Sequence, residues 1–350
     1  MVFYSNYFFT VEHMIREYLK LSRSFNAVLT GISPVMGAIA MGEFHLFTLF
    51  ILFLIGFLGH TFGFVFNDII DYRIDKTSKE ISDRPLISGT ISLKKAWIFA
   101  IVSIISAFII AIILAIYTTN FYPIIILIIS AILIILYDLI SKKLPFMDIF
   151  VAMGIFFFIF YGASTVTKNI NEITTIAWLV CILGSIQVLF MQIIAGGMKD
   201  IKNDYKKGAK TGAIKLGVRI NGKKLIVSNK FKFIAYFIQI INIIIIYIPF
   251  FYIPIFINQN QNLKYFQWII IGLIAFIMID LSYKLLFMKK FERKKARRYI
   301  GSHYMTSFAL VPILLMTLNP WAGLLVFFPA LGFILSNIIL HGTILQPKTM

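Results

Sequence analysis

Two short groups of aspartates lie between long apolar stretches of this 350-residue chain. Asp68, Asp71 and Asp75 form the first group, and Asp200 and Asp204 form the second. If both segments are helical, the first three fall within about 60° of one another and the second two lie one turn apart. Mg²⁺ usually bridges such carboxylates to the phosphates of a substrate. The spacing therefore predicts a magnesium site whose natural ligand is a diphosphate.

Basic residues follow each acidic group. Arg84 stands before Pro85, which disfavours helical backbone in the preceding residue, so we expect Arg84 to be extended and to point back at the first group. A guanidinium suits bidentate contact with a phosphate. Lys210 follows the second group in a Gly-Ala-Lys-Thr turn and is a further candidate for a phosphate contact. Two such groups predict a clamp that stabilises a diphosphate as it leaves.

Loss of a diphosphate from an allylic carbon leaves a carbocation that water would quench, so the reaction needs a dry cavity with aromatic walls. The chain has 36 Phe and 16 Tyr residues, which can supply such walls. Tyr137, at the end of an apolar stretch beside a polar loop, is the aromatic residue we single out for catalysis. We also assign Asp71 and Asp200 a catalytic role, because loss of either leaves diphosphate charge uncompensated.

The composition is that of a polytopic membrane protein, with 59% hydrophobic and 14% charged residues. Apolar stretches near or above the roughly 20 residues that cross a bilayer occur at 25–42, 46–66, 96–116, 121–137, 146–166, 174–197, 233–256, 267–288, 303–319 and 321–340. We expect an all-α fold with nine spans and a tenth near the C-terminus. Only Asn319-Pro320 separates the last two stretches.

The basic residues predict the orientation, because cytoplasmic loops retain Lys and Arg. Of the 33 basic residues, only Lys168 and Lys264 fall on the opposite side in the ten-span reading. Both termini and both acidic groups are then cytoplasmic. The same segregation explains the net charge of +18 without a nucleic-acid partner. Residues 1–22 place Phe8, Val11 and Ile15 at helical spacing, which predicts an amphipathic helix on the inner membrane surface.

Together these motifs resemble the UbiA superfamily of intramembrane prenyltransferases over roughly residues 16–319. The matching motifs are Asn67-Asp68-x-x-Asp71-x-x-x-Asp75, Asp83-Arg84-Pro85-Leu86-x-Ser88-Gly89, Tyr137 with Lys142, Asp200-x-x-x-Asp204 with Gly208 and Lys210-Thr211, and Arg23 with Asn26. The resemblance implies nine transmembrane helices around a central cavity. It also implies that Mg²⁺ and a polyprenyl diphosphate bind at the cytoplasmic mouth.

Roles for individual residues follow from that resemblance. The five aspartates of the two groups would hold Mg²⁺. Asn67, Arg84, Lys142 and Lys210 would contact the diphosphate, while Arg23 and Asn26 match the first-helix pattern and would bind substrate. The chain would divide into an amphipathic segment (1–22), a prenyltransferase domain (23–319) and an additional span with its tail (320–350). The tenth span and the basic run 289–298 are not required by the family core.

The identity of the acceptor rests on where the chain departs from the family. Lys202-Asn203-Asp204 stands where many archaeal lipid-forming members have Glu-Gly-Asp, and the spacing from Asp75 to Arg84 is more like that of members that prenylate 4-hydroxybenzoate. We therefore expect Mg²⁺-dependent transfer of a polyprenyl group to an aromatic acceptor, either 4-hydroxybenzoate-like or a naphthoate. The alternative is geranylgeranyl transfer to a prenylglyceryl phosphate in archaeal ether-lipid synthesis. The expected partners are the diphosphate donor, a lipophilic or aromatic acceptor and membrane lipids.

Two other classes of membrane protein use related features. A CDP-alcohol phosphotransferase also carries Asp-x-x-x-Asp, but its motif begins Asp-Gly-x-x-Ala-Arg, which this sequence lacks. A transporter would place charges at the middle of the membrane. Asp280 is the one obvious carboxylate well inside a predicted span, and Lys284 one turn later can pair with it. The sequence therefore favours an enzyme.

Overall fold

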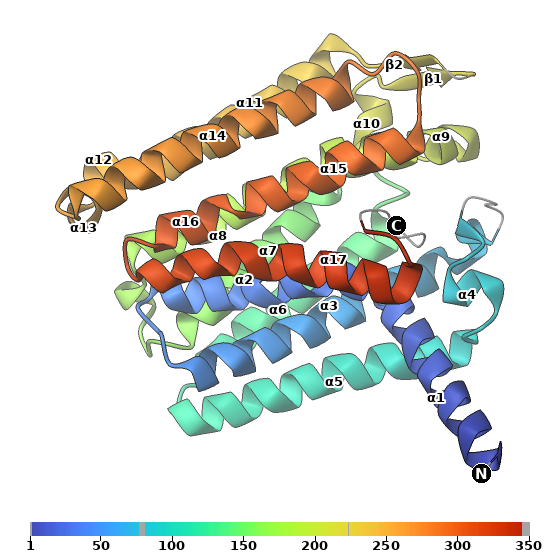
Figure 1. The fold of residues 1–350 in the computed structure, drawn as a ribbon, viewed down its shortest axis with the longest axis horizontal. Coiled ribbons are helices and arrows are strands. Elements are labelled where there is room, and N and C mark those ends of the chain that lie inside the picture. The colour runs from blue at the N-terminus through green and yellow to red at the C-terminus, as the bar shows by residue number, and fades with distance from the viewer. Residues whose placement is uncertain (1, 77–80, 223, 345–350) are drawn as a thin grey trace.

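The computed structural model describes residues 2–76, 81–222 and 224–344, without the side chains of residues 2–11, 74, 203 and 207. Its long helices lie roughly side by side, and both ends of the chain lie at the same end of the bundle (Figure 1). The helices of the first half are α1 (Val2–Leu21), α2 (Ser24–Ala40), α3 (Leu46–Asp75), α4 (Pro85–Ser88), α5 (Leu93–Thr118), α6 (Tyr122–Ile140) and α7 (Asp148–Ser164).

The second half of the chain continues this architecture. After the short helix η2 (Ile170–Glu172) its elements are α8 (Thr175–Phe190), η3 (Met191–Gly196), α9 (Gly197–Lys207), α10 (Gly212–Lys215), β1 (Arg219–Asn221), β2 (Lys224–Ile226), α11 (Asn229–Tyr247), α12 (Pro249–Tyr252), α13 (Pro254–Ile257), α14 (Gln261–Leu286), α15 (Arg293–Phe308), α16 (Leu310–Leu315), η4 (Pro320–Val326) and α17 (Phe327–His341).

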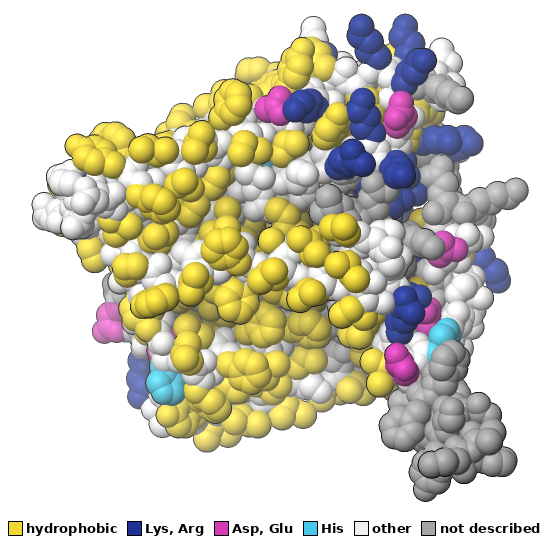
Figure 2. Space-filling model, viewed as in Figure 1, with side chains coloured by type: hydrophobic (Ala, Val, Ile, Leu, Met, Phe, Trp, Pro, Cys, Tyr) yellow, Lys and Arg dark blue, Asp and Glu magenta, His cyan; other side chains and the backbone are white. Residues whose placement is uncertain are grey.

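The all-α polytopic class predicted from the sequence is confirmed. Seven helical segments of the described residues are long and apolar enough to cross a membrane, and α2 and α7 are shorter apolar helices. Hydrophobic side chains cover most of the visible face of the molecule, whereas Lys and Arg gather mainly at one end of it (Figure 2). The count of nine spans plus a tenth stays a prediction.

Close helix contacts in the centre of the bundle depend on glycine. A Cβ atom at Gly37 of α2 would lie 2.0 Å from the Ile159 carbonyl oxygen of α7, and one at Gly162 would lie 1.8 Å from the Pro34 oxygen. Membrane helices associate by packing rather than by the hydrophobic effect, so small residues let the backbones touch. These contacts fix α2 against α7, and a similar approach holds α2 against α3, where a Cβ atom at Gly56 would lie 2.6 Å from the Gly31 oxygen.

Both acidic groups lie on helices, as the spacing predicted. The first group occupies the last turns of α3, which runs without interruption from Leu46 to Asp75. The second group lies on α9, which is joined to α8 through the π-helical segment Met191–Gly196. A π-helical turn inserts an extra residue and often marks a functional site.

Several element boundaries differ from those read from hydropathy. The stretch 233–256 is not one helix, because Pro249 and Pro254 end α11 and start two short helices. The helix α15 begins at Arg293, ten residues before the predicted apolar stretch. The strands β1 and β2 form an antiparallel hairpin in which Asn221 pairs with Lys224, and the sequence analysis did not predict it.

Candidate active site

A cavity of about 810 Å³ lies between the two acidic groups. Its mouth is charged, with contributions from α3, α6, α9 and α15 and from Arg23, which directly precedes α2. Its inner part is apolar and includes Ile55 of α3, Phe108 of α5, Leu127 of α6 and Phe158 of α7. The site therefore combines polar groups that suit a phosphate with a chamber that suits a hydrocarbon chain.

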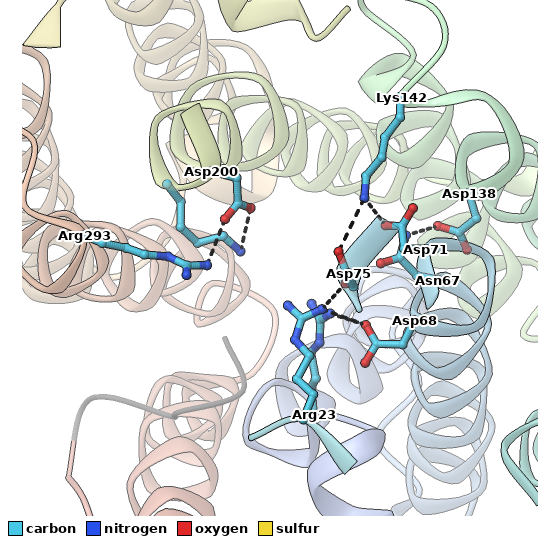
Figure 3. A network of polar contacts seen from close by, with 11 residues as sticks. Arg23, Asn67, Asp68, Asp71, Asp75, Asp138, Lys142, Asp200 and Arg293 are labelled. Atoms are coloured by element: carbon cyan, nitrogen blue, oxygen red, sulfur yellow. Dashed lines mark hydrogen bonds and ion pairs between the residues drawn. The ribbon is translucent and has the colours of Figure 1, made fainter. Parts of the chain in front are cut away.

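The three carboxylates of the first group are held by cations from other elements (Figure 3). Asp68 lies 2.5 Å from the Arg23 guanidinium and 3.3 Å from Arg84. Asp75 lies 2.7 Å from Arg84, and Asp71 lies 2.5 Å from Lys142. Sequence reasoning placed all of these residues in the site, and the structure brings them together.

The backbone around the two arginines explains how they reach the carboxylates. Arg84 is extended, at φ −69° and ψ 136°, directly before the Pro85 that starts α4, as expected. Arg23 adopts the left-handed conformation at the start of α2, with φ 49° and ψ 47°. A non-glycine residue in this region is strained by about 1–3 kcal/mol and persists where surrounding contacts hold it. The Asp68 ion pair is such a contact.

Arg84 stays charged although it is buried. Burial alone would lower the pKa of its guanidinium, but Asp68 and Asp75 outweigh that effect and raise the pKa above its ordinary value. A fixed positive charge is thus available beside the carboxylates. It can bind phosphate oxygens without first taking up a proton.

The second acidic group has a different set of partners. Asp200 lies 3.1 Å from the guanidinium of Arg293 and 3.5 Å from the amine of Lys199. Asp204 lies one turn further along α9 and also lines the cavity. Burial, followed by the charge of Asp200, raises the pKa of Asp204 to about 7. This carboxylate therefore gains and loses its proton near neutral pH.

Three cavity residues were missed by the sequence analysis. Lys199 directly precedes Asp200, and its position beside an acidic group was a signal that went unused. Arg293 lies in the basic run 289–298, from which the sequence analysis chose no site residue; in the structure α15 carries Arg293 to Asp200. Asp138 accepts a hydrogen bond from Asn67 at 2.9 Å, and the predicted span ended just before it.

The remaining predicted residues fall into two sets. Tyr137 and Asn26 line the cavity, as their proposed roles require. Lys210 is exposed, whereas Ala209 and Thr211 on either side of it line the cavity. The turn therefore reaches the site, but the contact between Lys210 and a phosphate stays a prediction. Outside the site, Asp280 and Lys284 lie 2.5 Å apart, as expected for a paired charge within a span.

The carboxylates do not form a ready-made metal cage. Among the described residues, no three His, Cys, Asp or Glu side chains are placed to hold a metal ion by themselves. Mg²⁺ is usually bound by one or two carboxylates together with substrate phosphates, so a closed cage is not required. Asp71 with Asp75, and Asp200 with Asp204, are pairs of this kind. The donor set therefore fits Mg²⁺, and its assignment to these residues stays a prediction.

The chain is similar to known proteins along most of its length. A sequence model of the UbiA prenyltransferase family matches residues 27–284. The digeranylgeranylglyceryl phosphate synthase of Sulfurisphaera tokodaii is 24% identical over 311 residues, which cover 87% of this chain and 98% of that protein. The enzyme of the same name from Saccharolobus solfataricus is 28% identical, with 77% and 87% covered. The 4-hydroxybenzoate octaprenyltransferase of Blochmanniella pennsylvanica is 24% identical, with 63% and 78% covered.

Solved structures share the fold. A UbiA homologue from Aeropyrum pernix matches with a TM-score of 0.63 at 14% identity, over 85% of this chain and 97% of its own. A UbiA homologue from Archaeoglobus fulgidus, solved with DMAPP and Mg²⁺, matches with a TM-score of 0.55 at 17% identity, over 84% of this chain and 99% of its own. The structure of a digeranylgeranylglyceryl phosphate synthase matches with a TM-score of 0.59 at 21% identity, over 88% and 98%.

Proposed function

The chain belongs to the UbiA prenyltransferase family, and from this premise we propose that it transfers a polyprenyl group from an allylic diphosphate to a prenylglyceryl phosphate. It is a prenyltransferase of the membrane, with apolar helices around its site. The acceptor we propose is the alternative raised by the sequence analysis. The aromatic acceptor we first expected is supported by one of the relatives named above, and the glyceryl phosphate by two.

The observation that carries this proposal is the cavity itself. Two acidic helix ends face each other across its mouth, and an apolar chamber continues from the mouth into the bundle. A polyprenyl diphosphate has the matching division into a charged head and a hydrocarbon tail. With the head between α3 and α9, the tail would extend along the cavity wall to which Gly63 of α3 and Ile134 of α6 contribute.

The reaction is a substitution at the allylic carbon. A hydroxyl oxygen of the glycerol forms a new bond to that carbon, and the bond from the carbon to the diphosphate oxygen breaks. The diphosphate leaves with the bonding electrons, and the hydroxyl proton passes to water at the mouth. Arg84, Arg23 and Lys142 would bind the leaving group as its charge develops. The ring of Tyr137 would stabilise the positive charge on the allylic carbon.

Mg²⁺ held by Asp71 and Asp75 on α3 and by Asp200 and Asp204 on α9 would neutralise diphosphate charge. Asp68, which we also expected to bind the metal, is paired with Arg23 and Arg84 in this structure. It would position the two arginines whether or not it also binds the ion. Asn67 would act through Asp138, to which it donates a hydrogen bond.

The experiment that tests this function uses purified protein in lipid vesicles with Mg²⁺ and labelled geranylgeranyl diphosphate. The acceptors are geranylgeranylglyceryl phosphate, 4-hydroxybenzoate and a hydroxynaphthoate. We expect label in the glyceryl phosphate lipid only. Transfer to either ring in place of the lipid would overturn the proposed acceptor, while no transfer from the diphosphate to any of the three would contradict the whole assignment.

We also propose that the active site and both termini face the cytoplasm. The support is the gathering of Lys and Arg at one end of the bundle, in agreement with the rule that cytoplasmic loops retain positive charge. A cysteine at position 168, in a background without Cys181, should react with an impermeant reagent from outside the cell, and a cysteine at position 295 should not. The reverse pattern would invert the topology.

A further inference from the structure

The cavity has a second side, which α15 and α17 form. Arg293, Ile300, Gly301 and Tyr304 of α15 line it, together with Phe333 of α17. At eleven residues, the step from Arg293 to Tyr304 spans about 16 Å of helix, from the charged mouth into the apolar interior. Residues spaced in this way form one stripe along the helix. This stripe is long enough to line the binding path of a second lipid.

The cations on this side are more buried than the carboxylate that pairs with them. The side chains of Arg293 and Lys199 are 14% and 16% exposed, whereas that of Asp200 is 37% exposed. In Figure 3, Arg293 approaches Asp200 from the side opposite the α3 cluster. When a donor diphosphate binds between α3 and α9, Asp200 would ligate the metal ion that holds it. Arg293 and Lys199 both line the cavity, so an anionic group of a second ligand on this side would lie beside two cations.

Space beside α15 is open for a ligand. A Cβ atom built on Gly301 would meet no atom of the described residues within 4 Å. Tyr304 and Phe333 continue the wall with aromatic surface toward the interior. The arrangement thus repeats the division into a charged head site and an apolar path that characterises the donor side.

We infer that α15 forms the acceptor subsite, in which Arg293 and Lys199 bind the phosphate monoester of the prenylglyceryl phosphate and the Gly301–Tyr304 stripe receives its hydrocarbon chain. This inference rests on the proposed function. The acceptor glycerol carries one phosphate, one ether and one free hydroxyl on three carbons. The hydroxyl is therefore only a few covalent bonds from the phosphate. A phosphate held by Arg293 and Lys199 would place the reacting hydroxyl near Asp200 and the departing diphosphate.

A two-by-two experiment isolates the phosphate contact. Wild type and Arg293→Gln are each assayed with geranylgeranylglyceryl phosphate and with geranylgeranylglycerol, which lacks the phosphate. We expect Arg293→Gln to raise KM for the phosphorylated acceptor by about 10- to 100-fold, as for a lost hydrogen bond to a charged group. The KM values for the unphosphorylated acceptor and for the donor should change less than twofold. Arg293→Lys keeps the charge and should be intermediate, and it serves if the glutamine variant does not fold.

Other results would overturn the subsite. If Arg293 only neutralises Asp200, the donor KM and the half-saturating Mg²⁺ concentration will rise in parallel with the acceptor KM. An unchanged acceptor KM would exclude the contact outright. The proposed path of the acceptor's hydrocarbon chain is tested by Gly301→Leu, which should raise the acceptor KM alone. The control is Gly63→Leu on the opposite wall, which should raise the donor KM alone.

The subsite can also be tested without turnover. Geranylgeranylglyceryl phosphate should raise the melting temperature of wild type and not of Arg293→Gln, whereas a non-hydrolysable thio-diphosphate analogue of the donor should stabilise both. If wild type transfers nothing to the lipid but is stabilised by it in this way, the proposed function fails and the phosphate site stands. If stabilisation by the lipid is equal in both proteins, the site fails.

Discussion

The two acidic groups have the same residue type and the same location at the cavity mouth, yet their surroundings differ. On α3, Asp68 and Asp71 are buried, and each carboxylate of the group is paired with a cation from another part of the chain. On α9, Asp200 is more exposed and pairs with two cations, Arg293 and Lys199. Burial and the charge of Asp200 raise the pKa of Asp204 to about 7. We call the first group the fixed frame, because each of its carboxylates is held in an ion pair. The second group is adjustable, because Asp204 can gain or lose a proton near neutral pH.

The helices that carry the groups differ in the same sense. The helix α3 is continuous to Asp75, so its carboxylates are positioned by regular helix geometry. The helix α9 follows a π-helical segment, a rare backbone form that is frequently found at functional sites. We expect the residues of α3 to bind the diphosphate of the donor. The residues of α9 should be sensitive to metal binding, to pH and to the bound acceptor.

The largest expected effect tests whether both groups are needed. Asp71→Ala and Asp200→Ala should each lower turnover by at least about a hundredfold, because diphosphate charge is left uncompensated as it develops. Chelation of Mg²⁺ with EDTA should have the same effect and be reversed by added Mg²⁺. Steady-state rates with labelled donor measure both. Full activity of Asp200→Ala would show that the α3 group acts without the α9 group.

A smaller effect is expected from weakening the fixed frame. Arg84→Lys keeps the charge but removes the fork of donors, so it should raise the donor KM about tenfold, equivalent to about 1.4 kcal/mol, and leave the acceptor KM nearly unchanged. If Arg84 serves only to tie Asp68 and Asp75 together, both KM values and the melting temperature will shift together. An unchanged donor KM would rule out the phosphate contact.

The pH dependence should distinguish the adjustable group from the fixed one. Asp204 has a pKa of about 7, so it is protonated below that pH and ionised above it. Metal binding needs the ionised form, so the half-saturating Mg²⁺ concentration should rise about fivefold between pH 7 and pH 6. In Asp204→Asn this pH dependence should disappear, with weaker binding throughout. Persistence of the same dependence in the variant would assign it to another group.

The smallest effect concerns Lys210. Its side chain is exposed, so Lys210→Gln should change the donor KM less than about twofold, in contrast to Arg84→Lys. Measured side by side under the same salt conditions, the two variants rank the predicted phosphate contacts. A loss at Lys210 as large as that at Arg84 would mean that the turn from Gly208 to Thr211 closes over the diphosphate when it binds.

Much of this site could be predicted from the sequence because its signals are local. A helical period of 3.6 residues places Asp71 and Asp75 on neighbouring turns whatever surrounds them, and the ring of Pro85 imposes extended backbone on Arg84. Apolar length likewise predicted the helices near their observed bounds. The proline breaks after Tyr247 and the early start of α15 were misplaced, because hydropathy measures composition and does not detect where backbone hydrogen bonds end.

By itself the sequence determined the membrane class, the two acidic helices and the residues that resemble the family. Which cation faces which carboxylate was decided by the tertiary structure alone. Arg293 is 93 residues from Asp200, and Asp138 is 71 residues from Asn67. Such contacts depend on which faces of distant helices meet, and here α15 meets α9 and α6 meets α3. Local periodicity carries no information about that choice, so the basic run 289–298 read as ordinary cytoplasmic charge until the fold placed one of its members in the cavity.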